Sequence, residues 1–351
     1  MSTHCKAAIG VATASILSLC SVASAQRIGK NLDEIAQLAN KEKIVRVASS
    51  WEPENEAALL KGFYQKYPSI KVTHSRASGI ETRERILNEA LAGVVDHDLV
   101  NVSGELRNQY VKAGIIAGPI DWRRLFPTVK EAHFSPDGHF AVTGFSTYII
   151  AYNPSLVPKE KVPKKWDDCL DPYWKGKLVV LTRPRTFTGL AAGWGEEKTI
   201  AFARALKDNR PVWKSSQSGA LTQVAIGEYP MICGMAYHSM KSVLMRDPKA
   251  KIAYSVPSDL PFQIGEAMAI MKGAKNPNAA LLLTGWLVTP EGQKGMHLEG
   301  RSSPFVEGTE AAELVKKHNA KIVFESWDAL QHEAAMARKI IGAWGFPKAK
   351  N

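Results

Sequence analysis

Strand-like and helix-like segments alternate along the first half of this chain, and their order is the strongest constraint on its fold. Runs rich in apolar and β-branched residues at 44–50, 70–77 and 98–103 predict strands. The stretches between them, 52–67 and 81–93, have the apolar spacing of helices. Strands and helices that alternate in this way form mostly parallel sheets with helices on their faces.

A second alternating series predicts a second sheet in the other half of the chain. Its expected strands and helices lie at 177–182, 187–209, 218–228, 230–237, 251–257 and 266–273. An apolar, β-rich run at 141–153 separates the two series and could pass from one domain into the other. The chain could cross back near 258–262, which would leave a cleft between two hinged lobes.

The length of the chain also indicates two domains. About 325 residues remain after the leader described below, which is more than one compact core usually holds. We therefore expect an α/β fold of two lobes, each a mostly parallel sheet flanked by helices, joined by crossing hinge strands. The expected parts are a signal peptide at 1–25, lobe 1 at 26–142 with 262–310 returning to it, lobe 2 at 146–258, and a C-terminal helical segment at 311–351.

Residues 1–25 have the organisation of a secretory signal peptide. A single lysine precedes an apolar core at 7–22, and the small residues Ala23 and Ala25 stand where a signal peptidase cleaves. A membrane anchor is the alternative, but it needs roughly 20 apolar residues, and this core is shorter and interrupted by hydroxyl residues. We expect export to the periplasm and a mature protein that begins at Gln26.

The charge of the chain is basic but scattered. Cleavage removes one lysine and no acidic residue, so the net charge falls from +11 to +10. The densest basic run, at 159–165, is interrupted by Glu160 and by a proline. An exported protein with dispersed lysines is expected to have a solvated cationic surface and no nucleic-acid partner.

Two of the four cysteines leave with the leader, and Cys169 and Cys233 remain. Both have apolar neighbours, which favours two buried thiols over a disulfide. Neither cysteine has the spacing of a metal site, so no resident metal or other cofactor is expected.

The stretch TRPRTFTGL, at 182–190, places two arginines and several threonines at the expected start of a helix. A helix start exposes backbone N–H groups and the positive end of the helix dipole, so Arg183, Arg185, Thr186 and Thr188 suit an anion there. The alternative is that a threonine caps the helix while both arginines lie in solvent.

Small and hydroxyl residues follow the three strands expected in the first half. Ligands of open α/β sheets bind beyond the carboxyl ends of such strands, although each of these residues could instead form a turn or a cap. The candidate ligand-binding residues at these ends are Ser49, Ser50, Trp51, Ser78, Gly79 and Ser103.

Six stretches spread over the mature chain carry a family resemblance. They are FYQKYPSIKV (63–72), ILNEALAGVVDHDLV (86–100), YNPSLVPKEKVPKKWDDCLDPYWKGKLVV (152–180), GEEKTIAFARALKDN (195–209), ALTQVAIGEYPM (220–231) and NPNAALLLTGWLVTPEGQ (276–293). In this order they resemble extracellular solute-binding proteins of ATP-driven importers, in the group that includes ferric, thiamine, polyamine and phosphonate binders. The resemblance implies a two-lobed periplasmic-binding-protein fold of type II that closes like a hinge on a small-molecule ligand.

The same resemblance implies partners and the absence of catalysis. The partners would be a membrane permease and its ATPase subunits, and the protein would be a monomer. No dinucleotide, phosphate-loop, zinc-protease or nucleophile-elbow motif is present in the sequence. His297 and Glu299 follow a short polar helix pattern and are expected at the surface. A secreted enzyme is the alternative from another class.

The residues that ferric members of the family would need are only partly present. The resemblance implies a histidine or acid after the first strand, an acid after the second, two adjacent tyrosines in the second lobe, and arginines for a synergistic anion. This chain offers Glu81 near the second place and Tyr237 with His238 in place of the tyrosine pair. Ser146 and Tyr148 stand where the arginines are expected. Ferric iron, held by Glu81, Tyr237 and His238, is therefore the second choice of ligand.

The resemblance places the 182–190 segment at the cleft, where its two arginines would meet the ligand. A second helix start at 215–218 supplies Ser218. Two positive helix starts favour an organic anion with a carboxylate or phosphate group over a cation. Trp51 and Tyr237 could add a stacking wall or could pack away from the cleft.

Overall fold

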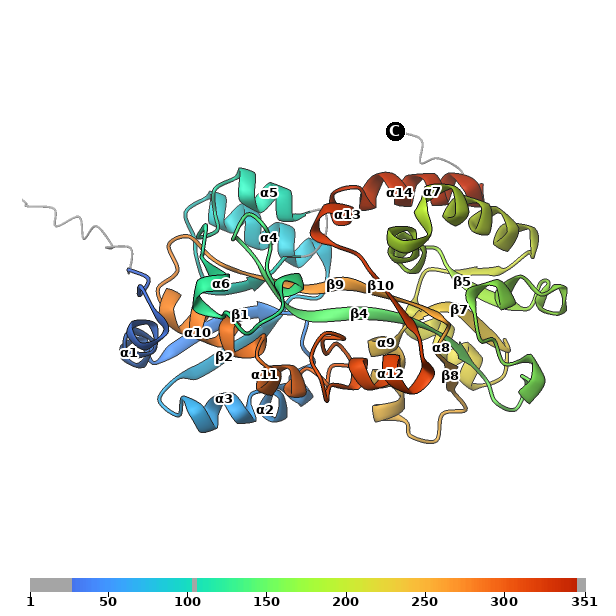
Figure 1. Ribbon diagram of the computed structural model, residues 1–351, viewed down its shortest axis with the longest axis horizontal. Helices are drawn as coiled ribbons and strands as arrows, with labels where there is room; N and C mark the ends of the chain where they lie inside the picture. The colour runs from blue at the N-terminus through green and yellow to red at the C-terminus, as the bar shows by residue number, and fades with distance from the viewer. Residues whose placement is uncertain (1–26, 103–105, 346–351) are drawn as a thin grey trace, which may run out of the picture.

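Two long antiparallel strands form the centre of the computed structural model, which describes residues 27–102 and 106–345. They are β4 (Ala141–Tyr152) and β9 (Asp259–Ile270), and each has 12 residues. Figure 1 shows both strands running between two groups of helices and strands. We call the group around β1 to β3 lobe 1 and the group around β5 to β7 lobe 2.

One sheet of ten strands passes through both lobes. Its order is β2-β1-β3-β9-β4-β7-β5-β6, with β10 paired to β9 and β8 paired to β4. The short strands within each lobe are parallel, and each lobe joins the central pair through an antiparallel contact. The bounds of the short strands are β1 Ile44–Ser49, β2 Lys71–Arg76, β3 Leu99–Asn101, β5 Leu178–Leu181, β6 Val212–Lys214, β7 Met231–Ala236, β8 Ala253–Ser255 and β10 Lys321–Phe324.

Helices cover this sheet in both lobes. In lobe 1 they are α1 (Leu32–Glu42), α2 (Glu56–Leu59), α3 (Lys61–Lys66), α4 (Ile80–Leu91), α5 (Leu106–Lys112), α6 (Trp122–Leu125), α10 (Pro277–Leu287) and α11 (Pro290–Gly295). In lobe 2 they are α7 (Arg185–Asp208), α8 (Gln217–Ala225) and α9 (Tyr237–Arg246). The C-terminal segment contributes α12 (Glu310–His318), α13 (Trp327–Gln331) and α14 (Glu333–Trp344). Five 3-10 helices lie at Pro53–Asn55, Glu131–His133, Lys159–Lys161, Trp166–Leu170 and Pro172–Trp174.

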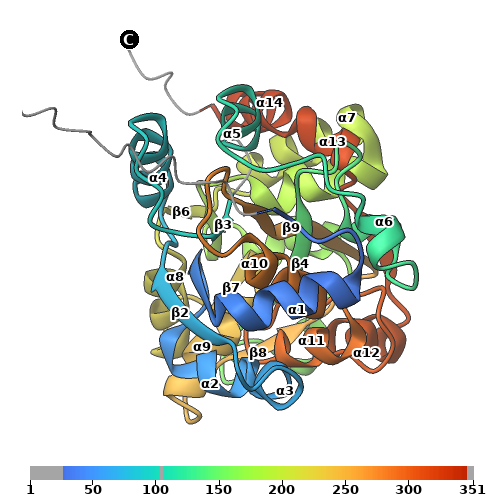
Figure 2. The ribbon, with the colours of Figure 1, turned by 90° about the vertical axis from the view of Figure 1, so that its left-hand side faces the viewer.

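The burial of α10 follows from its sequence. All eleven of its residues are buried, as expected for a helix that is apolar on every side. The amphipathic α1 covers it, with Ile35 and Ala39 inward, and Figure 2 shows α1 lying across the front of lobe 1. Asn31 caps α1 by accepting a hydrogen bond from the backbone N–H of Glu34.

The expected alternation of strands and helices is confirmed in both lobes, and the fold is α/β with two lobes. The predicted strand at 98–103 is observed as β3, and the predicted helix at 187–209 is α7 with a kink at Gly195, whose φ is 76°. The predicted domain boundaries stay a proposal, and the segment after 310 contains β10 as well as helices. Among the described residues, no helix has the length and apolar character needed to cross a membrane. The expected signal peptide lies outside the described residues.

The two remaining cysteines form a disulfide, so the prediction of two free thiols is wrong. Cys169 and Cys233 are both fully buried in lobe 2, and their Cα atoms are 6.3 Å apart. Their apolar neighbours bring both residues into the same core, with Cys169 in a 3-10 helix and Cys233 in β7. The apolar neighbours of each cysteine indicate burial, but they do not show that the two distant segments meet.

Candidate functional site

A cavity of about 530 Å³ lies against lobe 2, and Arg76 of lobe 1 also lines it. Its lining comes from the end of β2, from β4, from the turn between β5 and α7, from the start of α8, and from α9. The lining residues are Arg76, Tyr148, Leu181, Arg183, Arg185, Thr186, Ser215, Ser216, Gln217, Ser218, Ser239, Ser242, Val243 and Arg246. Within the part of the chain that the structure describes, four arginines and five serines face this cavity without any aspartate or glutamate.

Three helices of lobe 2 contribute their first turns to the cavity. Thr186 is in the first turn of α7, Ser218 in that of α8, and Ser239 in that of α9. Ser216 caps α8 by accepting a hydrogen bond of 3.1 Å from the backbone N–H of Gly219. Each start adds partial positive charge to that of the arginines.

The two arginines of the β5–α7 turn differ in how they are held. Arg185 Nη1 forms a 2.8 Å ion pair with Glu333 of α14, and its Nε donates to the Tyr148 hydroxyl over 3.4 Å. Arg183 is exposed, and among residues 27–102 and 106–345 its side chain has no hydrogen bond or ion pair. Arg185 is thus fixed in direction, whereas Arg183 is free to turn toward a ligand.

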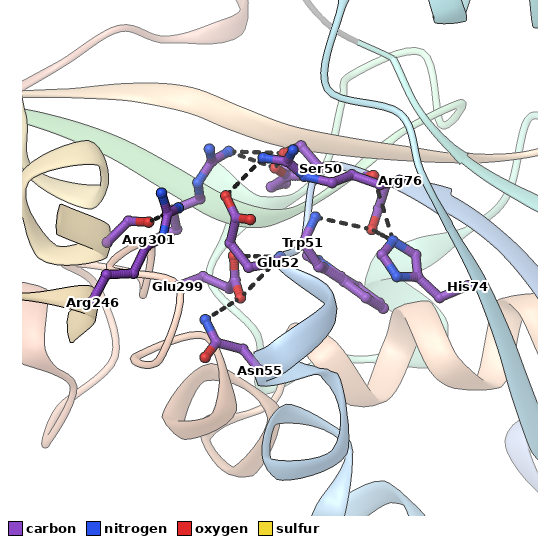
Figure 3. A network of polar contacts seen from close by, with 12 residues as sticks. Ser50, Trp51, Glu52, Asn55, His74, Arg76, Arg246, Glu299 and Arg301 are labelled. Atoms are coloured by element: carbon purple, nitrogen blue, oxygen red, sulfur yellow. Dashed lines mark hydrogen bonds and ion pairs between the residues drawn. The ribbon is translucent and has the colours of Figure 1, made fainter. Parts of the chain in front are cut away.

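Two further arginines close the cavity from opposite lobes, and Figure 3 shows both. Arg76, the last residue of β2, forms a 2.7 Å ion pair with Glu52 of lobe 1. Arg246, the last residue of α9, donates to the Ser242 hydroxyl over 2.6 Å. An anion between them would be contacted from both lobes.

A smaller pocket of about 140 Å³ adjoins the cavity and shares Ser242 and Arg246 with it. Glu299 lines this pocket and accepts hydrogen bonds from Asn55 Nδ2 at 2.8 Å and from the backbone N–H of Glu52 at 3.2 Å (Figure 3). Burial raises the pKa of the Glu299 carboxyl. Glu299 is 7% exposed, so its predicted place at the surface is wrong, while His297 is exposed as expected.

A buried ion pair lies at the back of the small pocket. Arg301 Nη1 is 2.5 Å from Glu266 Oε1, and Ser50 donates a short hydrogen bond to the same oxygen. Arg301 Nη1 also donates to Ser50 Oγ over 3.1 Å, as Figure 3 shows. His238 lines the pocket as a neutral ring, because burial lowers its pKa well below the usual value.

The structure brings part of the predicted site together at these two cavities. Tyr148, Arg183, Arg185, Thr186 and Ser218 line the large cavity, and His238 lines the small one. Ser50 contacts Arg301 beside the small pocket rather than a free surface.

Other predicted residues have structural roles instead. Trp51 is fully buried and packs 5.3 Å from the His74 ring, so it forms no exposed stacking wall. Ser49 hydrogen-bonds to the same histidine. Thr188 donates to the Arg185 carbonyl and accepts from Gln263, which places it beneath the helix start.

The remaining predicted residues lie in neither cavity. Ser146 is buried in β4, where its hydroxyl packs against Gly265 so closely that a side chain on that glycine would collide with it. Ser78, Gly79 and Glu81 lie at the start of α4, away from both linings. Ser103 lies outside the described residues.

The residues expected for iron do not converge on a free ligand set. The Tyr237 hydroxyl donates to Glu310 over 2.9 Å, and burial together with that carboxylate raises the pKa of the phenol. The ring of Tyr237 packs against Tyr254, 5.6 Å away, in the core. In the described part of the chain, no three His, Cys, Asp or Glu side chains are grouped so that they could hold a metal ion.

Sequence reasoning missed Arg76, Arg246, Arg301 and Glu266, and it placed Glu299 at the surface. Arg76 ends β2, so the rule that ligands bind at strand ends could have included it. The other four come from α9, β9 and the loop after α11, which meet only in the folded chain.

Comparison with known families places the chain among transport proteins. Residues 97–333 match the model of a family described as bacterial extracellular solute-binding protein. An uncharacterized protein of Haemophilus influenzae is 25% identical over 229 residues, which are 61% of this chain and 64% of the relative. The Fe(3+)-binding periplasmic protein of Serratia marcescens is 23% identical over 179 residues, or 50% of this chain and 51% of the relative. The matched parts thus span between half and two thirds of these relatives.

Solved structures share the fold over nearly their whole length. The Trichodesmium protein IdiA (FutA), solved in complex with iron and citrate ligands, has a TM-score of 0.67 with this chain. The two are 17% identical, and the match covers 86% of this chain and 99% of the other. At this identity the likeness concerns the fold, which is that of two-lobed periplasmic binding proteins.

Proposed function

Because this chain belongs to the bacterial extracellular solute-binding proteins, we propose that its cavity captures an organic anion with a carboxylate or phosphate group for an ABC importer. The observation that carries this proposal is the cavity lining, in which four arginines and five serines occur without an acidic side chain among the described residues. Guanidinium groups and serine hydroxyls are hydrogen-bond donors that match carboxylate and phosphate oxygens.

The starts of three helices also favour an anionic ligand. The first turns of α7, α8 and α9 meet at the cavity, and each favours negative charge through its backbone N–H groups and dipole. A cationic ligand such as a polyamine would have to displace solvent from the arginines without gaining an opposite charge in the large cavity.

The positions of the arginines give a reason for closure on the ligand. Arg76 belongs to lobe 1, whereas Arg183, Arg185 and Arg246 belong to lobe 2. A ligand can favour the closed form only by binding it more tightly than the open form, and contacts from both lobes provide that difference. In the proposed cycle the closed, monomeric complex then delivers its ligand in the periplasm to a membrane permease with ATPase subunits, without chemical change.

Calorimetric titration tests the proposal. Purified protein would be titrated with sodium salts of inorganic phosphate, citrate, succinate and a sugar phosphate, and with putrescine as the cationic comparison. We expect binding of at least one anion with one site per chain, weakened at least tenfold in Arg246→Ala. Arg204 on the exposed face of α7, outside both cavities, provides a matched control in Arg204→Ala. Tight putrescine binding without anion binding would overturn the proposal.

Ferric iron is the second candidate, and the names of the relatives favour it over a free organic anion. The Serratia marcescens relative is named as Fe(3+)-binding, and the Trichodesmium structure holds iron and citrate. Ferric ion prefers anionic oxygen ligands, which the large cavity lacks, so a chelating anion would have to supply them. Under this alternative the arginines would hold the anion and the anion would hold the iron.

Titration with ferric citrate and with ferric ion plus carbonate separates the two candidates. We expect no stoichiometric coloured complex with ferric ion and carbonate, because Tyr237 is committed to Glu310. A coloured one-to-one complex that Tyr237→Phe abolishes would establish iron as the ligand instead.

A further inference from the structure

A group of buried charges lies behind the large cavity, and the cavity arginine Arg185 is part of it. Glu333 at the start of α14 forms the 2.8 Å ion pair with Arg185. Glu325, which follows β10, is 2% exposed and accepts a 3.2 Å hydrogen bond from Gln263 of β9. Arg107 of α5 is 5% exposed, and Glu325 and Glu333 are the charges that attract it most.

These charges come from both lobes and from the C-terminal segment. Arg107 belongs to lobe 1 and Arg185 to lobe 2, while the two glutamates belong to the segment that follows α12. Figure 1 shows this segment crossing beside β9 as β10 and then running along α7 as α14. Glu333 of the C-terminal segment thus contacts a cavity arginine of lobe 2, and Glu325 lies against Gln263 of the central strand β9.

The negative charges of the two carboxylates repel each other. Burial, and next the charge of Glu333, raise the pKa of the Glu325 carboxyl to about 7. Near neutral pH the two carboxylates together therefore carry between one and two negative charges, and the two arginines carry two positive charges.

We propose that Glu333 and Glu325 are positioning residues for Arg185, and that the protein takes up a proton on this carboxylate pair when an anion enters the cavity. The inference rests on the proposed function, since it requires an anion beside Arg185. An anion there adds negative charge near the pair and makes protonation more favourable. By reciprocity, protonation of the pair must strengthen anion binding to the same extent.

The other groups that face Glu325 do not take up a proton near neutral pH. Tyr148 of β4 stays protonated because burial raises its pKa, and Gln263 of β9 has no charge to change. The guanidinium groups of α5 and α7 remain charged throughout. His332 precedes Glu333 and is exposed, so it serves as a control.

The linkage has a definite sign. The folded pKa of Glu325 lies above that of an ordinary glutamate, so the pair loses its proton as the pH rises through 7. Anion affinity should therefore fall as the pH rises from 6 to 8. Coupling between sites in proteins is commonly about fivefold or more in affinity.

Sulfate is the probe, because its charge is constant over this range. Calorimetric titrations of the full mature chain at pH 6, 7 and 8, each in two buffers with different heats of ionisation, measure the affinity and the protons taken up. We expect sulfate to bind about fivefold more tightly at pH 6 than at pH 8, with buffer-dependent heat that reports proton uptake near pH 7. Glu325→Gln should remove both effects, and His332→Gln should keep them.

The outcomes separate this inference from the proposed function. Sulfate that binds equally at pH 6 and 8, with heat independent of the buffer, would refute proton linkage and leave the anion site intact. If sulfate affinity depends on pH equally in the wild type and in a folded Glu325→Gln, the proton binds elsewhere, and the inference is refuted as well. Absence of sulfate and phosphate binding at every pH would count against the anion site itself. The buffer comparison needs no variant, so it tests proton uptake on anion binding even if Glu325→Gln fails to fold.

Discussion

Replacement of the two arginines of the β5–α7 turn, Arg183 and Arg185, one at a time should separate ligand binding from fold stability. Arg183→Ala removes an exposed guanidinium that has no partner within the described residues. A hydrogen bond to a charged group contributes about 1.5–3 kcal/mol, which corresponds to a loss of roughly tenfold to a hundredfold in anion affinity. Since the Arg183 side chain is exposed and forms no hydrogen bond or ion pair within the described residues, the free energy of unfolding should change by less than about 0.5 kcal/mol.

Arg185→Ala should weaken the same ligand and also destabilise the fold. Its removal leaves Glu333, whose side chain is 13% exposed, near the charge of Glu325 and without its ion-pair partner. Breaking a fully buried pair costs about 3–5 kcal/mol, but the Arg185 side chain is 37% exposed, so about 1–2 kcal/mol is expected here. The ion pair with α14 is the reason for this expected loss of stability.

The assay is calorimetric titration with the anion that binds best, alongside urea unfolding of both variants and of the Arg204→Ala control. We expect weaker binding in both variants and lower stability only in Arg185→Ala. Unchanged affinity in both variants would mean that the turn between β5 and α7 is only a capped helix start with arginines in solvent. Equal destabilisation in both would contradict the described difference in their contacts.

Three further predictions concern the fold and export. His133 donates from Nδ1 to the Val142 carbonyl, and burial lowers its pKa to about 4. The free energy of unfolding should therefore fall by up to about 3 kcal/mol as the pH drops from 6.5 toward 4. The decrease should be smaller in His133→Gln. Urea unfolding at several pH values measures this, and a flat profile would contradict it. The Cys169–Cys233 disulfide joins residues 64 positions apart, so its reduction should lower the free energy of unfolding by about 4 kcal/mol in the same assay. An unchanged free energy of unfolding would argue against the bond. N-terminal sequencing of exported protein should give Gln26, and an intact Met1 would refute cleavage.

The order of strands and helices was predictable because apolar residues recur with one spacing in strands and with another in helices. Apolar runs gave β1, β2 and β7, and helical spacing gave α4 and α7, since these patterns depend on neighbours in the sequence. The short strands β6 and β10 were missed. They have three and four residues, and pairing with β5 and β9 rather than their own sequence makes them strands.

The candidate site was predictable where a local pattern in the sequence marks its residues. The arginines at 183 and 185 were found because they precede a helix start in the sequence. Glu333 and Arg246 could not be found in this way, because they approach the site from α14 and α9 through tertiary packing. Trp51 was misassigned since a residue that follows a strand can turn into the core as readily as into a cleft.

Native mass spectrometry of freshly purified mature protein tests the central claim most directly. The mass difference between native and denatured protein identifies what the cavity carries, and metal analysis of the same sample reports iron. We predict a bound organic anion with a carboxylate or phosphate group, at one per chain, which is lost in Arg246→Ala. One ferric ion per chain without an accompanying anion, retained in Arg246→Ala, would contradict it.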